Sequence, residues 1–361
     1  MLTVKTILAK KSFSKENLVT LLKSSGNDRL ELFKAAAAIK QKKIGNHVFL
    51  RGLIEYSNIC DKNCFYCGIR KDIRNINRYK ITQDEIKRAF EYVLKNNFGS
   101  LVLQSGEISH PQFTKTITIF LEIAKNISDG KLGITLSCGE QSESTYKQWF
   151  NAGAHRYLLR IETSSPELYK KLHPTDDKHN FFKRKQSLYL LKNLGYQVGT
   201  GVMIGLPWQS TTDLANDLLF MKDLDIDMCG MGPYIEHVDT PLFKHKDILI
   251  PLKERFDLTL KMIAILRLMM PDINIAATTA MQAIDKQGRE KALMVGANIL
   301  MPNVTPRKYR EDYFLYENKP CYDENPDDCL PCLEARVVAS GNKIIFGEWG
   351  DSKHFAKRHQ A

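Results

Sequence analysis

The sequence predicts an α/β fold, a (β/α)8 barrel of the TIM type, on two observations. Strand-like runs and segments of helical periodicity alternate from residue 48 onward, and eight such strands fall within about 250 residues, the usual length of this barrel. Chemically reactive side chains recur at the carboxyl ends of the predicted strands, where the active sites of such barrels lie. An open doubly wound sheet alternates in the same way, but no G-x-G-x-x-G motif follows the first strand, which disfavours that alternative.

The strands are predicted from short strand-like runs. They are expected at residues 48–57, 100–106, 133–138, 156–162, 198–206, 228–234, 273–280 and 297–303. The segments between them carry apolar residues at helical spacing. The first of these helices opens with a capping box between Thr82 and Glu85, which marks its start.

The chain is divided into three parts by this pattern. The barrel is expected to span residues 48–303, and residues 1–47 form a helical N-terminal extension. Residues 304–361 form a C-terminal tail that contains a second group of cysteines, and we expect this tail to wrap onto the barrel.

The composition indicates a soluble globular protein, with 43% hydrophobic and 26% charged residues. The longest apolar runs are too short to span a bilayer, and the N-terminus lacks the pattern of a signal peptide. We therefore expect a cytoplasmic protein with no membrane partner. The net charge of +11 is spread along the chain among 41 acidic residues, which favours a solvated basic surface over a nucleic-acid groove.

The eight cysteines are unevenly distributed. Cys138 and Cys229 stand alone in apolar segments and are interpreted as small buried residues. In a reducing cytosol, clustered cysteines bind metals more often than they form disulfides. The two clusters are Cys60, Cys64 and Cys67, and Cys321, Cys329 and Cys332.

The first cluster follows the first strand with the spacing Cys60-x3-Cys64-x2-Cys67, and no fourth cysteine is near. Three thiolates can bind a zinc ion that a distant residue completes, or a four-iron cluster with one iron left open. An open iron offers a small molecule a position to chelate. Tyr66, with Phe65 before it, offers a flat surface for a purine.

This cysteine spacing, with an aromatic residue before the last cysteine and after the first strand of a barrel, resembles the radical S-adenosylmethionine (SAM) enzymes. The resemblance implies a [4Fe-4S] cluster on Cys60, Cys64 and Cys67, whose open iron binds the amino and carboxylate groups of SAM. One electron from the cluster then cleaves the sulfonium and releases a 5′-deoxyadenosyl radical. The protein's part is binding, orientation and the exclusion of water from that radical.

Further segments, spread from about residue 50 to residue 315, are similar to the HydE family of [FeFe]-hydrogenase maturases. These segments are LVLQSGE, GITLSCGE, AGAHRYLLRIET, GVMIGLPWQS, MGPYIEHVDTPL, NIAATTAMQAI and GANILMPNVTPRKYR.

The resemblance to HydE implies roles for residues at the strand ends. Ser105, Gly106 and Glu107 would lie near the methionyl amino group of SAM. Arg184 would pair with the methionyl carboxylate, for which its planar fork is suited. Glu162 would bind the nucleoside, and Met203 would line the adenine or sulfonium region. The alternatives are a solvated charge on a helix for Arg184 and an ion pair at the barrel rim for Glu162.

The barrel interior would hold the substrate. The candidate polar residues are Arg51, Gln104, Thr135, Arg160, Thr278, Thr279 and Tyr316. Arg51 and Arg160 suit an anion such as cyanide or a carboxylate. A structural network of buried salt bridges is the competing interpretation.

The second cluster, Cys321-x7-Cys329-x2-Cys332, resembles an accessory motif that only some HydE proteins carry. It predicts a second iron–sulfur cluster, [2Fe-2S] or [4Fe-4S]. The alternative is a zinc site completed by His354 or His359.

The resemblance implies a maturase that acts on a cysteine-bound Fe(CO)2(CN) unit in assembly of the hydrogenase cluster. Other hydrogenase maturases and an electron donor such as a ferredoxin or a flavodoxin would be its partners. The first alternative is a radical enzyme acting on an organic amino acid or thiol, of the biotin synthase or methylornithine synthase kind. A non-enzymatic iron–sulfur carrier or RNA-binding module is the second.

Three positions depart from the pattern of the family. Ile161 stands where a His is expected, Cys138 where a Leu is expected, and Trp208 where a Gly follows the Pro. A His lost near the adenosyl site would point to a different substrate.

Overall fold

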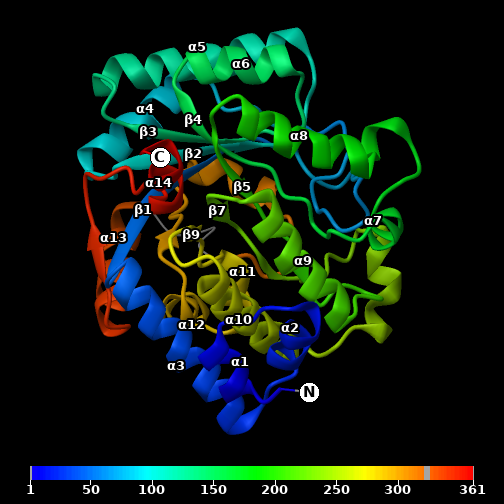
Figure 1. Ribbon diagram of the computed structural model, residues 1–361. Helices are drawn as coiled ribbons and strands as arrows, with labels where there is room; N and C mark the ends of the chain where they lie inside the picture. Colours follow the sequence, from blue (N-terminus) through cyan, green and yellow to red (C-terminus); the bar gives the residue numbers. More distant parts are fainter. Residues whose placement is uncertain (1, 321–325, 361) are drawn as a thin grey trace.

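The computed structural model describes residues 2–320 and 326–360, and within them eight parallel strands follow one another around a barrel (Figure 1). All of the strand pairs in this ring are parallel. The strands are β1 (His47–Ser57), β2 (Ser100–Ser105), β3 (Gly133–Ser137), β4 (Ala154–Leu158), β5 (Gln197–Thr200), β7 (Met228–Cys229), β9 (Asn274–Ile275) and β10 (Ile299–Leu300).

The ring closes between its last strands. β10 pairs with β1 on one side. On the other side it reaches β9 through a parallel bridge between Ala276 and Ile299, and the Asn298 amide donates to the Ile275 carbonyl at 2.9 Å. The predicted TIM-type α/β fold is therefore confirmed.

Two predicted strands are interrupted, which the sequence pattern did not show. β6 (Met203–Ile204) continues β5, and β8 (Gly232–Pro233) continues β7, as a separate parallel pair. The break lies at Gly201, where an added Cβ would stand only 2.0 Å from the carbonyl oxygen of Gly230. Close backbone approach of this kind is possible only without a side chain.

Helices surround the barrel. The outer layer contains α4 (Gln83–Lys95), α5 (Pro111–Ser128), α6 (Glu143–Asn151), α8 (Phe181–Asn193), α9 (Thr211–Leu224), α10 (Leu252–Met269) and α12 (Gly288–Val295). The capping box between Thr82 and Glu85 is present at the start of α4. Shorter elements follow the strands: α7 (Pro166–Leu172), η1 (Asp177–His179), η2 (Pro241–Ile248), α11 (Thr279–Ile284), η3 (Arg307–Tyr309) and η4 (Glu311–Tyr313).

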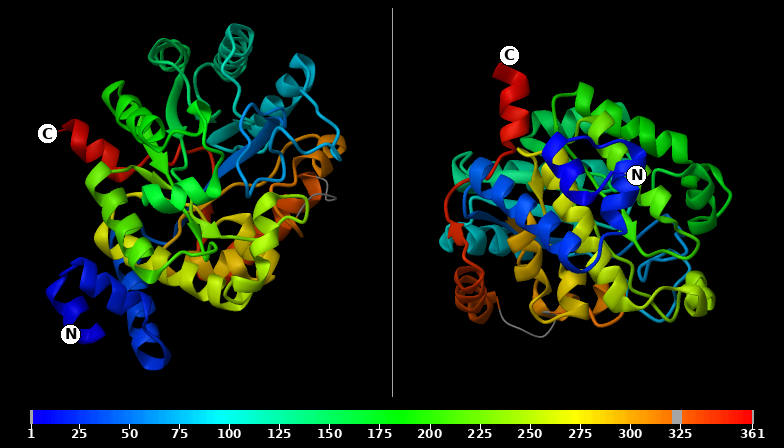
Figure 2. Two further views of the ribbon diagram at one scale, coloured as in Figure 1. Left: turned by 90° about the vertical axis from the view of Figure 1, so that its right-hand side faces the viewer. Right: turned by 60° about the horizontal axis from the view of Figure 1, so that its bottom comes forward.

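The N-terminal segment is helical. α1 (Val4–Lys10), α2 (Lys15–Leu22) and α3 (Gly26–Lys43) pack on α9, α10 and α12, outside the strands. Figure 2 shows these blue helices grouped on one side of the barrel.

The C-terminal tail contains α13 (Pro326–Ala339), β11 (Lys343–Ile345) and α14 (Lys353–Gln360). β11 adds to β1 in parallel, and the following residues cross the amino-terminal end of the barrel. There the Gly350 carbonyl accepts from Arg51 Nη2 at 3.2 Å and from Asn274 Nδ2 at 2.9 Å. The tail therefore seals the end of the barrel opposite to the expected active site.

Among the residues that the structure describes, no helix combines the length and the apolar composition needed to cross a bilayer.

Candidate active site

A cavity of about 550 Å³ lies at the carboxyl ends of the strands. Most of the predicted site residues line it. They are Cys60, Cys64, Cys67, Tyr66, Gln104, Ser105, Gly106, Glu107, Arg160, Glu162, Arg184, Met203, Thr278, Thr279 and Tyr316. Residues far apart in the chain therefore meet in a single chamber.

Two predicted substrate residues lie elsewhere. Arg51 and Thr135 line a separate void of about 20 Å³ next to the sealed end of the barrel. Arg51 donates to Gly350, and the Thr135 hydroxyl accepts from Arg156 Nε at 2.9 Å. The prediction that these two side chains face the substrate is corrected. Both lie inside the barrel toward the amino-terminal ends of the strands, whereas the cavity lies at the carboxyl ends.

The three clustered cysteines lie on the loop between β1 and α4, at the wall of the cavity. Burial raises the pKa of the Cys60 thiol, raises that of Cys64 well above its usual value, and raises that of Cys67 to about 12. Buried thiols become thiolates when a cation binds them. The Glu107 amide donates to Cys60 Sγ at 3.4 Å, which suits an anionic sulfur.

Three thiols on one loop suit the corners of an iron–sulfur cubane, which lie further apart than the ligands of a single ion. Within the described residues, no three His, Cys, Asp or Glu side chains are grouped as ligands of a single metal ion.

Arg78 fixes the cysteine loop from within. Its guanidinium donates to five backbone carbonyls, at 2.6 to 3.2 Å, and all of these lie on or beside the loop. The accepting carbonyls are those of Asn58, Ile69, Arg70, Lys71 and Ile73. Sequence reasoning missed Arg78, because a lone arginine in a basic stretch carries no motif.

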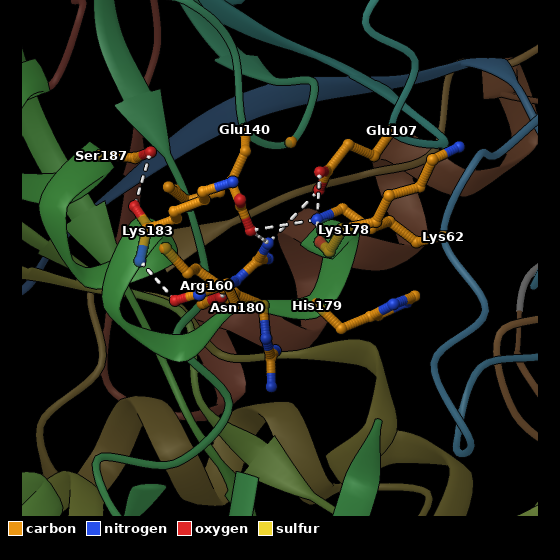
Figure 3. Close-up of polar contacts among 12 residues, drawn as sticks. Lys62, Glu107, Glu140, Arg160, Lys178, His179, Asn180, Lys183 and Ser187 are labelled. Atoms are coloured by element: carbon orange, nitrogen blue, oxygen red, sulfur yellow. Dashed lines mark hydrogen bonds and ion pairs between the residues drawn. The ribbon is translucent and has the colours of Figure 1, made fainter. Parts of the chain in front are cut away.

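Four charged side chains meet beside the cysteine loop, as Figure 3 shows for Lys62, Glu107 and Glu140. Lys62 Nζ lies 2.9 Å from Glu107 Oε1. Arg184 Nη1 lies 2.7 Å from Glu140 Oε1 and 3.3 Å from Glu107 Oε2. Burial raises the pKa of Glu107, which the neighbouring Arg184 opposes. Two carboxylates and two cations therefore balance each other.

This charge cluster fits the methionyl group of SAM. The ammonium and the carboxylate of the methionyl group can replace one cation and one carboxylate among these four side chains, so that the total charge stays balanced. Gly139 leaves room for the Glu107 side chain, because its φ is +74° and an added Cβ would stand 2.1 Å from Glu107 Cγ. The sequence analysis gave no role to Glu140 or to Lys62.

Arg160 and Glu162 form a bidentate pair on the cavity wall. Arg160 Nε lies 3.1 Å from both carboxylate oxygens, and Nη2 lies 3.0 Å from Oε2. Glu162 has φ +67°, a left-handed conformation that is costly for a residue with a side chain. Its backbone is fixed by Gly201 and Met203, so the carboxylate is held toward the cavity at the cost of this strain.

The opposite wall of the cavity is polar. Gln104 Nε2 lies 3.3 Å from the Tyr313 hydroxyl, and the hydroxyls of Thr279 and Tyr316 lie 2.8 Å apart. Sequence reasoning missed three polar residues of this wall, Glu55, Asn303 and Lys319. Lys319 Nζ lies 2.5 Å from Glu55 Oε1, and this buried pair fastens the chain before the second cysteine cluster to β1.

The second cysteine cluster is only partly described. Cys321 and the side chain of Cys329 lie outside the part of the chain that the structure describes. Cys332 is exposed and also lines the cavity. His354 pairs with Asp225 and His359 stacks on Phe355, both at the sealed end of the barrel, so the zinc alternative through these histidines is not supported.

The departures from the family pattern have structural explanations. Ile161 is fully buried and does not line the cavity, so this substitution leaves the chamber's polar wall unchanged. Cys138 is fully buried. Trp208 has φ +64°, a backbone conformation that a glycine adopts without strain.

A closed parallel barrel with three thiols after its first strand, and a charge cluster that suits an amino acid, defines the radical SAM class. The sequence model of the Radical SAM superfamily matches residues 54–221. The chain is 43% identical, over 96% of both chains, to the [FeFe] hydrogenase maturase subunit HydE of Thermotoga maritima. It is 30% identical to the 3-methylornithine synthase of Methanosarcina barkeri, over 83% of this chain and 82% of that protein.

Solved structures agree with this class. Methylornithine synthase (PylB) superimposes with a TM-score of 0.79 at 26% identity, over 96% of this chain and 98% of that chain. The [FeFe]-hydrogenase maturase HydG superimposes with a TM-score of 0.78 at 18% identity, over 99% and 80%, which shows the shared fold alone. The chain belongs to the radical SAM superfamily and, within it, to the HydE family. It is a radical SAM enzyme, and this family uses a [4Fe-4S] cluster and SAM.

Proposed function

We propose that the protein is an [FeFe]-hydrogenase maturase that acts on a small cysteine-bound Fe(CO)2(CN) precursor. The observation that carries the proposal is the 43% identity to a HydE protein over 96% of the chain. The chamber supports it, because it joins a charge cluster suited to SAM with a second polar wall that has room for a substrate.

The residues present suit the cofactors of the family. Cys60, Cys64 and Cys67 would hold the cluster, since their buried thiols border the chamber. When bound, the cluster and SAM supply the one-electron cleavage that yields a 5′-deoxyadenosyl radical. Glu107 would accept hydrogen bonds from the methionyl ammonium, and Arg184 would donate to the carboxylate.

Arg160 would bind the substrate while it orients Glu162. Its Nε and Nη2 are used by Glu162 and by the Val202 carbonyl, whereas Nη1 makes no hydrogen bond within the described part of the chain. Nη1 can therefore donate to an anionic ligand in the chamber, and a cyanide or carboxylate group is a suitable acceptor. Glu162 would in turn accept from the ribose hydroxyls of SAM, with Tyr66 and Met203 beside the nucleoside.

The remaining assignments follow from the family and the residues. Cys321, Cys329 and Cys332 would bind a second iron–sulfur cluster at the edge of the chamber, where Cys332 lies. Residues 1–47, 48–303 and 304–361 would act as extension, catalytic barrel and accessory tail. The protein would work in the cytoplasm with the other hydrogenase maturases and with a ferredoxin or flavodoxin as electron donor.

Complementation tests this function. A strain that lacks its HydE gene, supplied with this chain, should recover [FeFe]-hydrogenase activity, and the Cys64→Ala variant should not restore it. In parallel, the reconstituted protein with dithionite should convert SAM to 5′-deoxyadenosine. Cleavage without complementation would contradict the maturase function and favour an organic amino acid or thiol as substrate. Absence of both would favour a carrier protein.

A further inference from the structure

The segment of residues 172–179 contacts the cysteine loop through four of its residues, and we call it the clamp. The Phe65 amide donates to the Leu172 carbonyl at 2.9 Å. The Asn63 amide donates to His179 Nε2, also at 2.9 Å. The remaining two contacts pair Tyr66 with His173 and Lys62 with the Lys178 carbonyl. Residues between Cys60 and Cys67 are thus bound by a segment more than 100 positions away.

The hydrogen bonds fix the protonation of both histidines. A backbone amide can only donate, so Nε2 of His179 carries a lone pair toward Asn63. Its Nδ1 therefore carries the proton, directed at Asp176 Oδ1 at 2.6 Å. Such an imidazole is neutral, and it connects a surface carboxylate to an amide inside the cysteine loop.

His173 has the same tautomer for the same reason. Its Nδ1 lies 2.9 Å from the Tyr169 carbonyl, which can only accept, so Nε2 accepts from the Tyr66 hydroxyl at 3.2 Å. The ring stacks on Tyr169 with centroids 3.9 Å apart, and meets Tyr66 edge-on at 5.4 Å. This packing leaves one orientation for the imidazole.

Burial keeps both imidazoles neutral. His173 and His179 are 3% and 6% exposed. Burial lowers the pKa of His173 to about 3 and also lowers that of His179, for which Asp176 acts in the opposite direction. The ring centroids are 5.7 Å apart, so two charged rings would repel each other.

The clamp also connects the two halves of the cofactor site. Asn180 directly follows it and caps α8, with its side chain accepting from the amides of Phe182 and Lys183. Arg184 stands in the next turn of that helix, and its Nη1 reaches the charge cluster. The position of the cysteine loop is therefore set relative to the arginine that would bind the methionyl carboxylate.

We propose that His173 and His179 are positioning residues, which hold the cysteine loop in its cluster-binding conformation by accepting hydrogen bonds through Nε2. The function of this device is to order the loop before the cluster arrives. Ordering a loop costs conformational entropy, so a loop that is already ordered binds its cluster more tightly. The inference rests on the radical SAM class and is independent of the substrate.

Hydrogen exchange on the cluster-free protein tests this proposal. In His179→Phe, the Asn63 amide should exchange about ten-fold faster than in the wild type, because its acceptor is lost. His179→Gln, whose amide oxygen can replace Nε2 as an acceptor, should recover most of the protection. After reconstitution, the phenylalanine variant should also lose iron to a chelator several-fold faster, and the glutamine variant should not.

Two further variants make the outcome decisive. His155→Phe, at the sealed end of the barrel, is the matched control and should leave the loop's exchange unchanged. Asp176→Ala removes the acceptor of the His179 Nδ1 proton, and with it the bond that the same carboxylate oxygen accepts from the His179 amide, from a side chain that is 46% exposed; it should speed exchange about two-fold or more. Wild-type exchange at Asn63 in folded His179→Phe would overturn the proposal. If that variant does not fold, wild-type exchange in Asp176→Ala would overturn it.

Discussion

The two ends of the barrel use buried arginines in opposite ways. At the sealed end, the fully buried Arg156 donates to Thr135 and to the Trp349 carbonyl, and pairs with the more exposed Asp351. At the open end, Arg184 pairs with Glu107 and Glu140 along the wall of a large chamber. The first arrangement has no large cavity beside it, whereas the second can exchange its partners for a ligand. Whether a buried charge is structural or functional therefore depends on what lies beside it.

The largest expected difference between the ends concerns cysteines. Cys64→Ala removes one of three cluster thiols and should lower SAM cleavage by at least about 100-fold. Cys138→Ala, in the packed core, should keep cleavage and lower the free energy of unfolding by about 1–2 kcal/mol. Iron content, 5′-deoxyadenosine formation and urea denaturation measure these effects. Full cleavage by Cys64→Ala would remove the functional assignment of the open end.

The two arginines should give a reciprocal result. Arg156→Met should lower the free energy of unfolding by about 3 kcal/mol, because it removes a fully buried guanidinium together with its bonds to Thr135 and the Trp349 carbonyl. Arg184→Met should raise the dissociation constant of SAM about 10- to 100-fold, with a smaller loss of stability, because Lys62 still pairs with both Glu107 and Glu140. Isothermal titration and denaturation separate the two. Equal stability losses would show that both ends are structural.

A glycine pair tests how tightly the tail seals its end. Gly350 has φ +60°, and an added Cβ would stand 2.5 Å from Phe49 Cγ. Gly350→Ala should therefore cost about 3 kcal/mol, from both strain and overpacking. Gly341→Ala, with φ +76° and nothing within 4 Å, should cost about 1 kcal/mol. Similar melting temperatures for both variants would mean that the seal is loose.

The two ends should also respond to pH with opposite sign. Burial raises the pKa of Asp217, behind the open end, to about 7, against about 3.9 in the unfolded chain. Between these values the native state holds the extra proton, so Asp217 lowers stability by about 1 kcal/mol per unit as pH rises from about 4 to about 7. Asp217→Asn should abolish this slope in denaturation curves measured from pH 5 to 8. Parallel curves would contradict it.

Asp351 at the sealed end gives a pH dependence of stability with the opposite sign. Burial alone would raise its pKa, but hydrogen bonding to His155 and the charge of Arg156 hold that pKa below its usual value. Its stabilising effect is therefore present above about pH 4 and is lost as pH falls. Asp351→Asn should be less stable than the wild type at pH 7 and should approach it in acid.

Local patterns predicted the barrel well, because strand-like runs and amphipathic helices can be recognised from residues that are close together in the sequence. The eight strands lie where the sequence places them, although Gly201 and Gly230 break two of them. The cysteine loop was equally visible, since its three cysteines are within eight positions.

Contacts across the chain were not predictable in this way. Arg51 was placed at the wrong end because alternation shows which face of a strand a residue occupies but not which layer of the barrel it reaches. Lys62, Glu140, His173 and His179 had no motif, and their partners lie tens to hundreds of positions away. The seal formed by Gly350 depends on a close approach that no local pattern encodes.

The closure between β9 and β10 has a consequence for how the barrel is held together. β1 is 11 residues long, whereas β9 and β10 have two residues each and meet through one bridge. Thr278 and Asn303, which line the chamber, stand just beyond this short seam. The substrate wall of the ring is therefore held by a shorter ladder than the side beside the cysteine loop, where β1 and β2 pair over six positions. Cooperative pairing is thus concentrated in the half of the barrel that carries the three cysteines.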